Sequence, residues 1–261
     1  MIELQQLDPE MVSLIANLFA NYRRVDLTLE SIFEGQSGSN ISITLDSETT
    51  PRTVQIRQGS FIMFGGDAGS DTARILLENL APSCYIMPAA DEWISLARRV
   101  HGDRLLTTSR YSCSGDHLDF SHLTSLAGGY PDLSQPERIN YPLAELMRKD
   151  ELHRHHFGNF VSIDHFLDIG FGYCIREQGC VLAACTSSLV STKGVEVSVT
   201  TRPDYRRRGA ATLAAASFLI HCLENNRYPN WDAGNIKSVS LAQKLGYNYI
   251  GSYDVYCLSR S

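Results

Sequence analysis

The sequence predicts a mixed α+β protein in which helices flank a mixed, mostly antiparallel central sheet. Three observations support this fold class. Runs that alternate between apolar and polar residues with period two, such as residues 41–45, indicate strands. Apolar residues at helical spacing, as in residues 11–19, indicate helices that pack by one face. With 261 residues, 43% of them hydrophobic and 20% charged, the chain can bury a core without disulfides or metals.

Composition and charge exclude several classes of protein. No apolar run approaches the roughly 18 to 20 residues that a membrane-spanning helix requires. The first eight residues lack a basic stretch followed by an apolar core, so we expect a cytoplasmic protein. The 7 cysteines include no C-x-x-C pair, which indicates reduced thiols rather than a disulfide framework. A formal net charge of −6 disfavours nonspecific binding to nucleic acid.

The N-terminal half is expected to be an α/β unit. Its first helix opens at Asp8-Pro9, where an N-cap acceptor precedes a proline in the first turn. Alternating runs beyond it predict antiparallel strands, and two further segments predict helices. The expected strands are residues 41–45, 54–56, 61–64, 84–87 and 105–111, and the expected helices are residues 71–79 and 91–100. No motif in this half marks a ligand site.

Residues 112–136 contain a cluster of turn-forming residues and are expected to form a long connection. We place a domain boundary inside it, which gives an N-terminal domain of residues 1–125 and a C-terminal domain of residues 126–261. The C-terminal domain continues the pattern of strands and helices. Its expected strands are residues 139–141, 172–176, 181–189, 195–200, 247–250 and 254–258, and its expected helices are residues 143–151, 163–167, 209–224 and 235–245.

A strand, a basic glycine turn and a helix start follow one another directly around Gly209. The backbone N–H groups of a first helical turn lack intrahelical partners and carry the positive end of the helix dipole, so they suit a diphosphate. Glycine at 209 removes the Cβ that would block close approach, and Ala210 and Ala211 keep the turn slim. The neighbouring arginines can add charge-assisted hydrogen bonds. The segment therefore predicts a site for a small phosphate-bearing ligand.

Two linked motifs resemble the GNAT superfamily of N-acetyltransferases. The first is its coenzyme A motif Q/R-x-x-G-x-G/A, which Arg206, Gly209 and Ala211 match. The second is N-x-x-S-x-x-L-A-x-K-L-G, which begins at Asn235 and includes Ser238. Together with the Pro-x-Trp that precedes it, the combination more specifically resembles a bacterial GNAT acetyltransferase family with a divergent N-terminal half. The close resemblance covers about residues 195–258, and it suggests a degenerate GNAT-like unit for the N-terminal half.

The resemblance implies acetyl-CoA as the acetyl donor and a set of residues that hold it. Backbone groups around residues 199–201 would bond the pantetheine arm, amides of residues 207–212 would hold the diphosphate, and Asn235 and Ser238 would lie near the pantetheine. Asn235 is also placed as the N-cap of the last helix. The implied cofactor-binding residues are Val199, Thr200, Thr201, Arg206, Arg207, Arg208, Gly209, Ala210, Ala211, Thr212, Asn235 and Ser238.

Acetyl transfer to an amine needs a base for the acceptor and an acid for the leaving thiolate. Glu196 is the favoured base, because it lies on the strand that leads to the cofactor turn, near where some GNAT enzymes carry one. The alternative is a structural carboxylate, since its offset from the turn is one residue short and a slip of one residue reverses a strand side chain. Tyr247 is named for the acid, although this position is usually a core aromatic. Tyr253 and Tyr256 are further candidates.

The leading hypothesis is direct transfer to a primary amine of a small molecule or protein, in a ternary complex. The alternative is a CoA-binding regulatory or sensor protein without catalysis; a nucleic-acid-binding module that uses the arginines is a third class. We expect no metal, because His153, His155 and His156 beside a charged helix end are typical of solvated histidines. We also expect no membrane or nucleic-acid partner, and a homodimer is considered.

Overall fold

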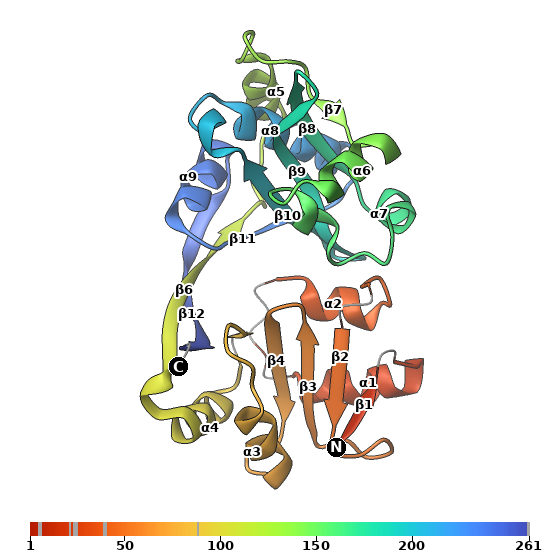
Figure 1. The fold of residues 1–261 in the computed structure, drawn as a ribbon, viewed down its shortest axis with the longest axis vertical. Helices are drawn as coiled ribbons and strands as arrows, with labels where there is room; N and C mark the ends of the chain where they lie inside the picture. Colours follow the sequence, from red (N-terminus) through yellow and green to blue (C-terminus); the bar gives the residue numbers. More distant parts are fainter. Residues whose placement is uncertain (5–6, 21, 23–25, 39–40, 88, 260–261) are drawn as a thin grey trace. The chain divides into compact units, whose positions relative to one another are not determined.

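The computed structural model describes residues 1–4, 7–20, 22, 26–38, 41–87 and 89–259. Within it the chain forms two compact units (Figure 1). Unit 1 comprises Met1–Val25, Ser39–Arg110 and Ser252–Ser261, and unit 2 comprises Asp26–Gly38 and Tyr111–Gly251. Each unit is therefore discontinuous in sequence. The predicted division after residue 125 lies inside a helix of unit 2, Phe120–Gly128.

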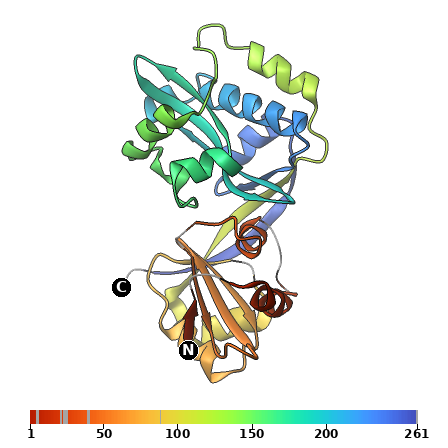
Figure 2. The same cartoon turned by 90° about the vertical axis from the view of Figure 1, so that its right-hand side faces the viewer.

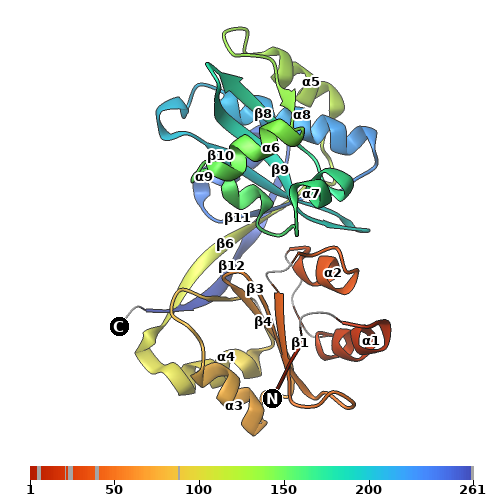
Figure 3. The same ribbon diagram turned by 45° about the vertical axis from the view of Figure 1, so that its right-hand side comes forward.

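Unit 1 is a sheet with helices on both faces. The strands are ordered β1-β2-β3-β4-β5-β12, and β4 and β5 are parallel whereas the other pairs are antiparallel. Figure 3 shows α1 on one side of this sheet and α3 and α4 on the other. The elements are β1 (Ile2–Leu4), α1 (Pro9–Leu18), β2 (Ile41–Leu45), β3 (Thr53–Gln58), β4 (Phe61–Gly66), α3 (Asp71–Glu78), β5 (Tyr85–Ile86), α4 (Asp91–His101), η1 (Gly102–Arg104) and the end of β12 (Asn248–Leu258).

Unit 2 has the strand order β7-β8-β9-β10-β11-β6, in which β10 and β11 are parallel. Helix α8 is apolar on all sides because it packs between the sheet and α5. Figure 2 shows α6 and α7 (green) on the opposite side of the sheet from α8 (blue). The elements are α2 (Thr28–Phe33), the end of β6 (Leu105–Ser114), α5 (Phe120–Gly128), β7 (Glu137–Arg138), α6 (Tyr141–Lys149), η2 (Arg154–Phe157), α7 (Ile163–Ile169), β8 (Gly172–Glu177), β9 (Cys180–Ser191), β10 (Gly194–Thr201), η3 (Pro203–Tyr205), α8 (Ala210–Glu224), β11 (Pro229–Ala233) and α9 (Ile236–Lys244).

The two units repeat one topology. In each, a meander of antiparallel strands is followed by a helix and then by a strand parallel to the last strand of the meander: β2-β3-β4-α3-β5 in unit 1 and β8-β9-β10-α8-β11 in unit 2. The final strand of each half of the sequence pairs with strands of the other unit. The end of β6 pairs with β11 at Cys113↔Trp231, and the end of β12 pairs with β5 at Tyr256↔Ile86. The two units thus share this order of strands and helix.

Most predicted elements are confirmed, including the first helix, whose Asp8 Oδ1 accepts the Met11 N–H at 2.8 Å. Three expectations were wrong. The long connection contains helix α5, which Asp119 caps by accepting the His122 N–H at 2.6 Å. The strand expected over residues 139–141 lies at residues 137–138, because Asn140 caps α6 instead. The two C-terminal strands are one, β12 (Asn248–Leu258), which lies between β5 and β6 in the order of strands.

Candidate active site

Strand β10 has an open edge. It pairs with β11 only at Val195↔Pro229 and Glu196↔Asn230, although it continues to Thr201. Beyond Asn230, β11 pairs with β6. Among the described residues, β10 therefore has no strand partner on that side over residues 197–201. The exposure pattern agrees, because residues 194–196 are buried and residues 197–201 are half-buried in the interior of a sheet. The backbone ladder between the two strands therefore stops after Glu196, and the unpaired edge of β10 over residues 197–201 is called the gap.

The register shows which backbone groups face this gap. Arg202 N–H donates to Leu182 O at 2.8 Å, so the backbone N–H of Arg202 points towards β9. Backbone groups alternate in direction along a strand, and no irregularity interrupts β10 after Val197. The backbone N–H and C=O groups of Thr200 therefore also point towards β9, whereas those of Val199 and Thr201 point towards the gap.

Glu196 lies where the strands part. Its Oε2 accepts a hydrogen bond from Asn230 Nδ2 at 2.7 Å, and its Oε1 accepts the Asp232 N–H at 3.2 Å. The Asp232 N–H would bond to β10 if the parallel ladder continued, so the carboxylate takes the place of a backbone acceptor and ends the pairing. Burial raises the pKa of the Glu196 carboxyl well above its ordinary value, and the carboxylates of Asp232 and Asp26 raise it further.

A β-bulge at this point explains why the spacing between Glu196 and the glycine turn did not decide which way the Glu196 side chain points. Its partner on β9 is Leu189, whereas the partner of Val197 is Ser187, so Ser188 is an extra residue in β9. The Ser188 hydroxyl donates to Glu196 O at 3.2 Å. The carboxylate is 8% exposed and lies between the strands rather than on the surface.

The turn after β10 leads into the N-terminus of α8. Gly209 is the N-cap, with φ of 93°, and no side chain caps this helix. The first-turn amides of the 15-residue helix, from Ala210 to Thr212, are therefore not used by a capping side chain. Arg206, Arg207 and Arg208 are exposed, and the Arg208 guanidinium lies 5.1 Å from the centre of the Tyr205 ring. The predicted anion-binding turn is thus uncapped and basic.

Tyr130 is a neighbour of this turn that the sequence did not indicate. A Cβ on Gly209 would lie 2.0 Å from Tyr130 Cε1, so the glycine is needed for this ring as well as for its positive φ. The Tyr130 hydroxyl accepts a hydrogen bond from Lys244 Nζ at 2.7 Å. Burial raises the pKa of Tyr130, but hydrogen bonds from Lys244 and Thr212 outweigh it, and the pKa lies below its ordinary value.

The second motif makes structural contacts. Asn235 caps α9, its Oδ1 accepting the Ser238 N–H at 3.1 Å. Ser238 Oγ accepts from Trp231 Nε1 at 3.0 Å. Tyr247 is a core residue, 3% exposed, whose hydroxyl donates to Pro229 O at 2.9 Å. Burial raises its pKa well above the ordinary value. Tyr253 and Tyr256 fall in the part of β12 that belongs to unit 1.

A family model described as GNAT acetyltransferase matches residues 18–256. The chain belongs to this GNAT acetyltransferase family. It is 26% identical over 225 residues to a Bacillus subtilis (strain 168) protein named "Uncharacterized N-acetyltransferase YdfB", a match that covers 82% of this chain and 84% of that protein. The expectations of a GNAT protein and of an acyltransferase are confirmed.

Solved structures confirm the GNAT fold. A GCN5-related N-acetyltransferase-like protein from Streptococcus suis 89/1591 superposes with a TM-score of 0.81 at 29% identity, covering 96% of this chain and 99% of that chain. A tandem GNAT protein from the clavulanic acid biosynthesis pathway, solved without AcCoA, superposes with a TM-score of 0.59 at 12% identity, covering 100% and 98%. The second likeness concerns the fold alone.

In unit 1 of this GNAT acetyltransferase, the position that corresponds to the open edge is closed. Trp93 Nε1 donates to Gly66 O at 3.1 Å at the end of β4, and its ring stacks on Phe64 at 4.6 Å. The turn before α3 uses its own amides: Asp67 Oδ1 accepts the Gly69 N–H at 2.8 Å, and Ser70 caps the helix through Ala73 N–H at 3.0 Å. This turn is acidic and capped, which disfavours a diphosphate.

The expectation that the histidines near residue 155 are solvated was wrong for two of them. His153 and His156 are 0% exposed. They lie three residues apart around the 3₁₀ turn η2, so both rings point to one side, towards β9 and β10. Among the described residues, no group of three or more His, Cys, Asp or Glu side chains is placed to hold a metal, and no helix is both long and apolar enough to cross a membrane.

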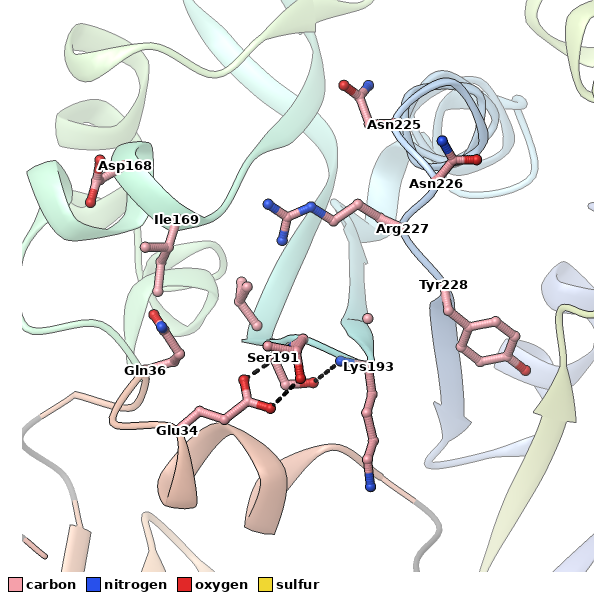
Figure 4. A pocket seen from close by; sticks show the side chains of 13 residues that line it. Glu34, Gln36, Asp168, Ile169, Ser191, Lys193, Asn225, Asn226, Arg227 and Tyr228 are labelled. Carbon is pink, nitrogen blue, oxygen red and sulfur yellow. Dashed lines mark hydrogen bonds between the residues drawn. The ribbon is translucent and has the colours of Figure 1, made fainter. Parts of the chain in front are cut away.

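A separate cavity of about 540 Å³ lies at the opposite end of β10, between the β9–β10 turn and the end of α8 (Figure 4). In it Glu34 accepts from the Thr192 N–H and hydroxyl at 2.7 and 2.6 Å. The lining residue Lys193 pairs through its Nζ with Glu30, outside the cavity lining, at 2.8 Å. The Arg227 side chain extends into the cavity (Figure 4). None of the predicted cofactor residues lines it.

The buried histidines predict an acid-sensitive fold. Burial lowers the pKa of His156 well below 6.5, and His155 and His153 lower it further, while burial also lowers the pKa of His153. The unfolded chain therefore binds more protons than the folded chain below about pH 6.5. Stability should be fully present above this pH and fall as the pH drops, by up to about 1.4 kcal/mol per pH unit for each ring.

Denaturant unfolding of His156→Gln and the parental chain between pH 5 and 7.5 checks this expectation. The variant should show a shallower loss of stability below pH 6.5. His117→Gln, at an exposed histidine, is the control and should keep the parental slope. Glu196 contributes in the opposite direction in all three proteins and cancels in the comparison. Equal slopes for the parental chain and His156→Gln would contradict the expectation.

Proposed function

We propose that the chain binds acetyl-CoA between β10 and β11 and transfers its acetyl group directly to a primary amine in a ternary complex. The observation that carries this proposal is that the pairing of the two parallel strands stops at Glu196, which leaves the edge of β10 open over residues 197–201. Unpaired backbone groups inside a sheet need a partner. The amides of the pantetheine arm supply donors and acceptors with the spacing of an extended chain.

The binding roles follow from the directions of the backbone groups. Val199 and Thr201 would bond the pantetheine arm, and the amides from Ala210 to Thr212 would hold the diphosphate at the positive end of the α8 dipole. The exposed arginines before Gly209 would add charge to the phosphate groups. Tyr130 and Lys244 border the same turn and would form one of its walls.

The chemistry centres on Glu196. A buried carboxylate with a raised pKa is a stronger base than an exposed one and suits the removal of a proton from an acceptor ammonium. The amine nitrogen would then attack the thioester carbon, while the N–H of Val197 or Val199 polarises the carbonyl oxygen. The C–S bond breaks, the nitrogen loses its second proton to form the amide, and the leaving thiolate takes up a proton, for which Tyr247 is the sequence-based candidate donor. The acceptor would be a small molecule or a protein that bears a primary amine.

Coenzyme A should bind with one molecule per chain, because the turn of unit 1 is capped and closed. Calorimetry measures the stoichiometry, and binding should raise the melting temperature. Gly209→Val should remove this rise, because its Cβ would meet the Tyr130 ring and its φ of 93° strains valine.

The control is Gly179→Val, which carries similar strain at φ of 80° but has nothing within 4 Å of the added Cβ. It should keep the parental rise in melting temperature. An undiminished rise in a folded Gly209→Val protein would place the site elsewhere, and two molecules per chain would contradict the closure of unit 1.

Glu196→Gln should reduce turnover of an identified amine by about 100-fold or more at neutral pH, with partial recovery at higher pH where more amine is free. The amide keeps the shape, and Asn230 can turn to present its Oδ1 to the new N–H₂ group. Acetyl-CoA affinity should stay within a few-fold of the parental value, because the carboxylate does not attract the anionic cofactor.

The control for this variant is Glu145→Gln, on the exposed face of α6, which should keep the parental turnover. Nearly parental turnover in Glu196→Gln would make Glu196 structural, and binding without turnover in the parental chain would indicate a sensor.

Tyr247→Phe separates the two roles of that residue. Because the hydroxyl donates to Pro229 O inside the core, we expect a loss of about 1 kcal/mol of stability and a change in kcat of less than about threefold. Urea unfolding and steady-state kinetics measure both. A fall in kcat of about 100-fold without a change in the KM for acetyl-CoA would instead support the acid role.

A further inference from the structure

A chain of hydrogen bonds joins two buried histidines to the cofactor strand. His156 Nδ1 lies 2.7 Å from Thr186 Oγ1, and His156 Nε2 lies 2.7 Å from Thr200 Oγ1. Thr200 Oγ1 also lies 2.8 Å from His153 Nδ1, and His153 Nε2 lies 3.1 Å from Val181 O. This series of hydrogen bonds thus runs from β9 to β10 and back to β9, and the segment around η2 supplies both histidine rings.

One end of the chain fixes the direction of every hydrogen bond. A carbonyl only accepts, so His153 Nε2 carries a proton and donates to Val181 O. The Nδ1 of the neutral ring must then accept, and the Thr200 hydroxyl donates to it. The Thr200 oxygen accepts in turn from His156 Nε2–H, and His156 Nδ1 accepts from the Thr186 hydroxyl. Burial lowers the pKa of both rings, which favours their neutral forms. For two neutral rings, a proton on Nε2 of each is the only arrangement that satisfies all four contacts.

The chain holds atoms in place and does not conduct protons, because it ends at a carbonyl that cannot release one. The same carbonyl, Val181 O, accepts a second hydrogen bond from Arg202 Nε at 2.9 Å, and the Arg202 guanidinium pairs with Asp150 at the end of α6. Thr200 and Arg202 are the two residues on either side of Thr201, and their backbone groups point towards β9. Side-chain bonds thus fix both residues that flank Thr201, immediately before the cofactor turn.

We propose that His153 and His156 are positioning residues for the cofactor: through the Thr200 hydroxyl they hold the open edge of β10 in the geometry that binds the pantetheine arm. The inference rests on the proposed function, because it assigns the Val199 and Thr201 backbone groups to acetyl-CoA. Thr200 itself contributes its hydroxyl to the histidines and its backbone to β9, so its part in binding is indirect.

Thr200→Val tests the proposal, because valine has nearly the shape of threonine and removes only the hydroxyl. It leaves His153 Nδ1 without a donor and His156 Nε2–H without an acceptor inside the protein. The KM for acetyl-CoA and the Kd for CoA should rise by about 10-fold, with kcat changed less than about threefold. Thr200→Ser restores the hydroxyl and should return both values to within about threefold of the parental values. Thr186→Val, at the far end of the chain, should raise them by a smaller factor.

Thr53→Val is the control, because Thr53 is a buried threonine of a strand in unit 1 whose hydroxyl lies 3.2 Å from Asp67 O and 2.8 Å from Ser70 Oγ. It should lower stability and leave the Kd for CoA unchanged. Nitrogen NMR of labelled histidines in the ligand-free protein at pH 7.5 gives an independent readout. Both rings should be neutral Nε2–H tautomers, and His156 should lose this preference in Thr200→Val.

The outcomes separate the inference from the function on which it rests. A parental chain that does not bind CoA refutes both. A parental chain that binds CoA while Thr200→Val binds it equally well refutes the positioning role alone. An Nδ1–H tautomer or an imidazolium at either histidine refutes the assigned chain, whatever the kinetics. If Thr200→Val fails to fold, Thr186→Val and the tautomers decide the question.

Discussion

The organisation of the C-terminal unit depends on one interaction, the carboxylate of Glu196 between β10 and β11. Two parallel strands that pair at Glu196↔Asn230 would ordinarily continue to pair along their length, since each further residue satisfies backbone groups on both. Here the carboxylate accepts the Asp232 N–H, while the opposite edge of β11 pairs with β6. Among the described residues, the backbone of β10 over residues 197–201 is left without a strand partner on this side. The same carboxylate has a raised pKa because the position that ends the ladder is buried.

The two units show how one topology reaches opposite results. In unit 2 the strand end is open and the following turn is basic and uncapped, with glycine at 209. In unit 1 the indole of Trp93 donates to the Gly66 carbonyl, and Asp67 and Ser70 occupy the amides of the turn before α3. A fold therefore does not by itself define a ligand site. The difference lies in a few side chains that either use the backbone groups of the turn or leave them exposed.

An open strand edge needs support from the rest of the sheet. On the β9 side, β10 has a full antiparallel ladder, a bulge at Ser188, and the side-chain bonds from Thr200 and Arg202. Buried polar groups stabilise a single arrangement only when all of them are satisfied, and the histidine chain meets this condition over its four contacts. Beyond the gap, β11 gains its other neighbour from the exchanged strand β6. Each of the two strands is thus paired on its other edge, β10 with β9 and β11 with β6.

The sequence by itself determined the three strands and the helix around the basic glycine turn, the cap at Asn235 and the family, because these depend on local spacing and on motifs within a few residues. It also predicted the first helix and the meander of unit 1. Only the tertiary structure decided which groups meet across long separations: Tyr130 with Gly209, Trp93 with Gly66, and the exchange of β6 and β12. Glu196 depended on both. The sequence indicated it as a candidate base, but a bulge in the neighbouring strand β9 set the direction of its side chain. The two histidines were read as solvated because charge dominates their local sequence, whereas hydrogen bonds from residues about 30 to 45 positions away compensate their burial.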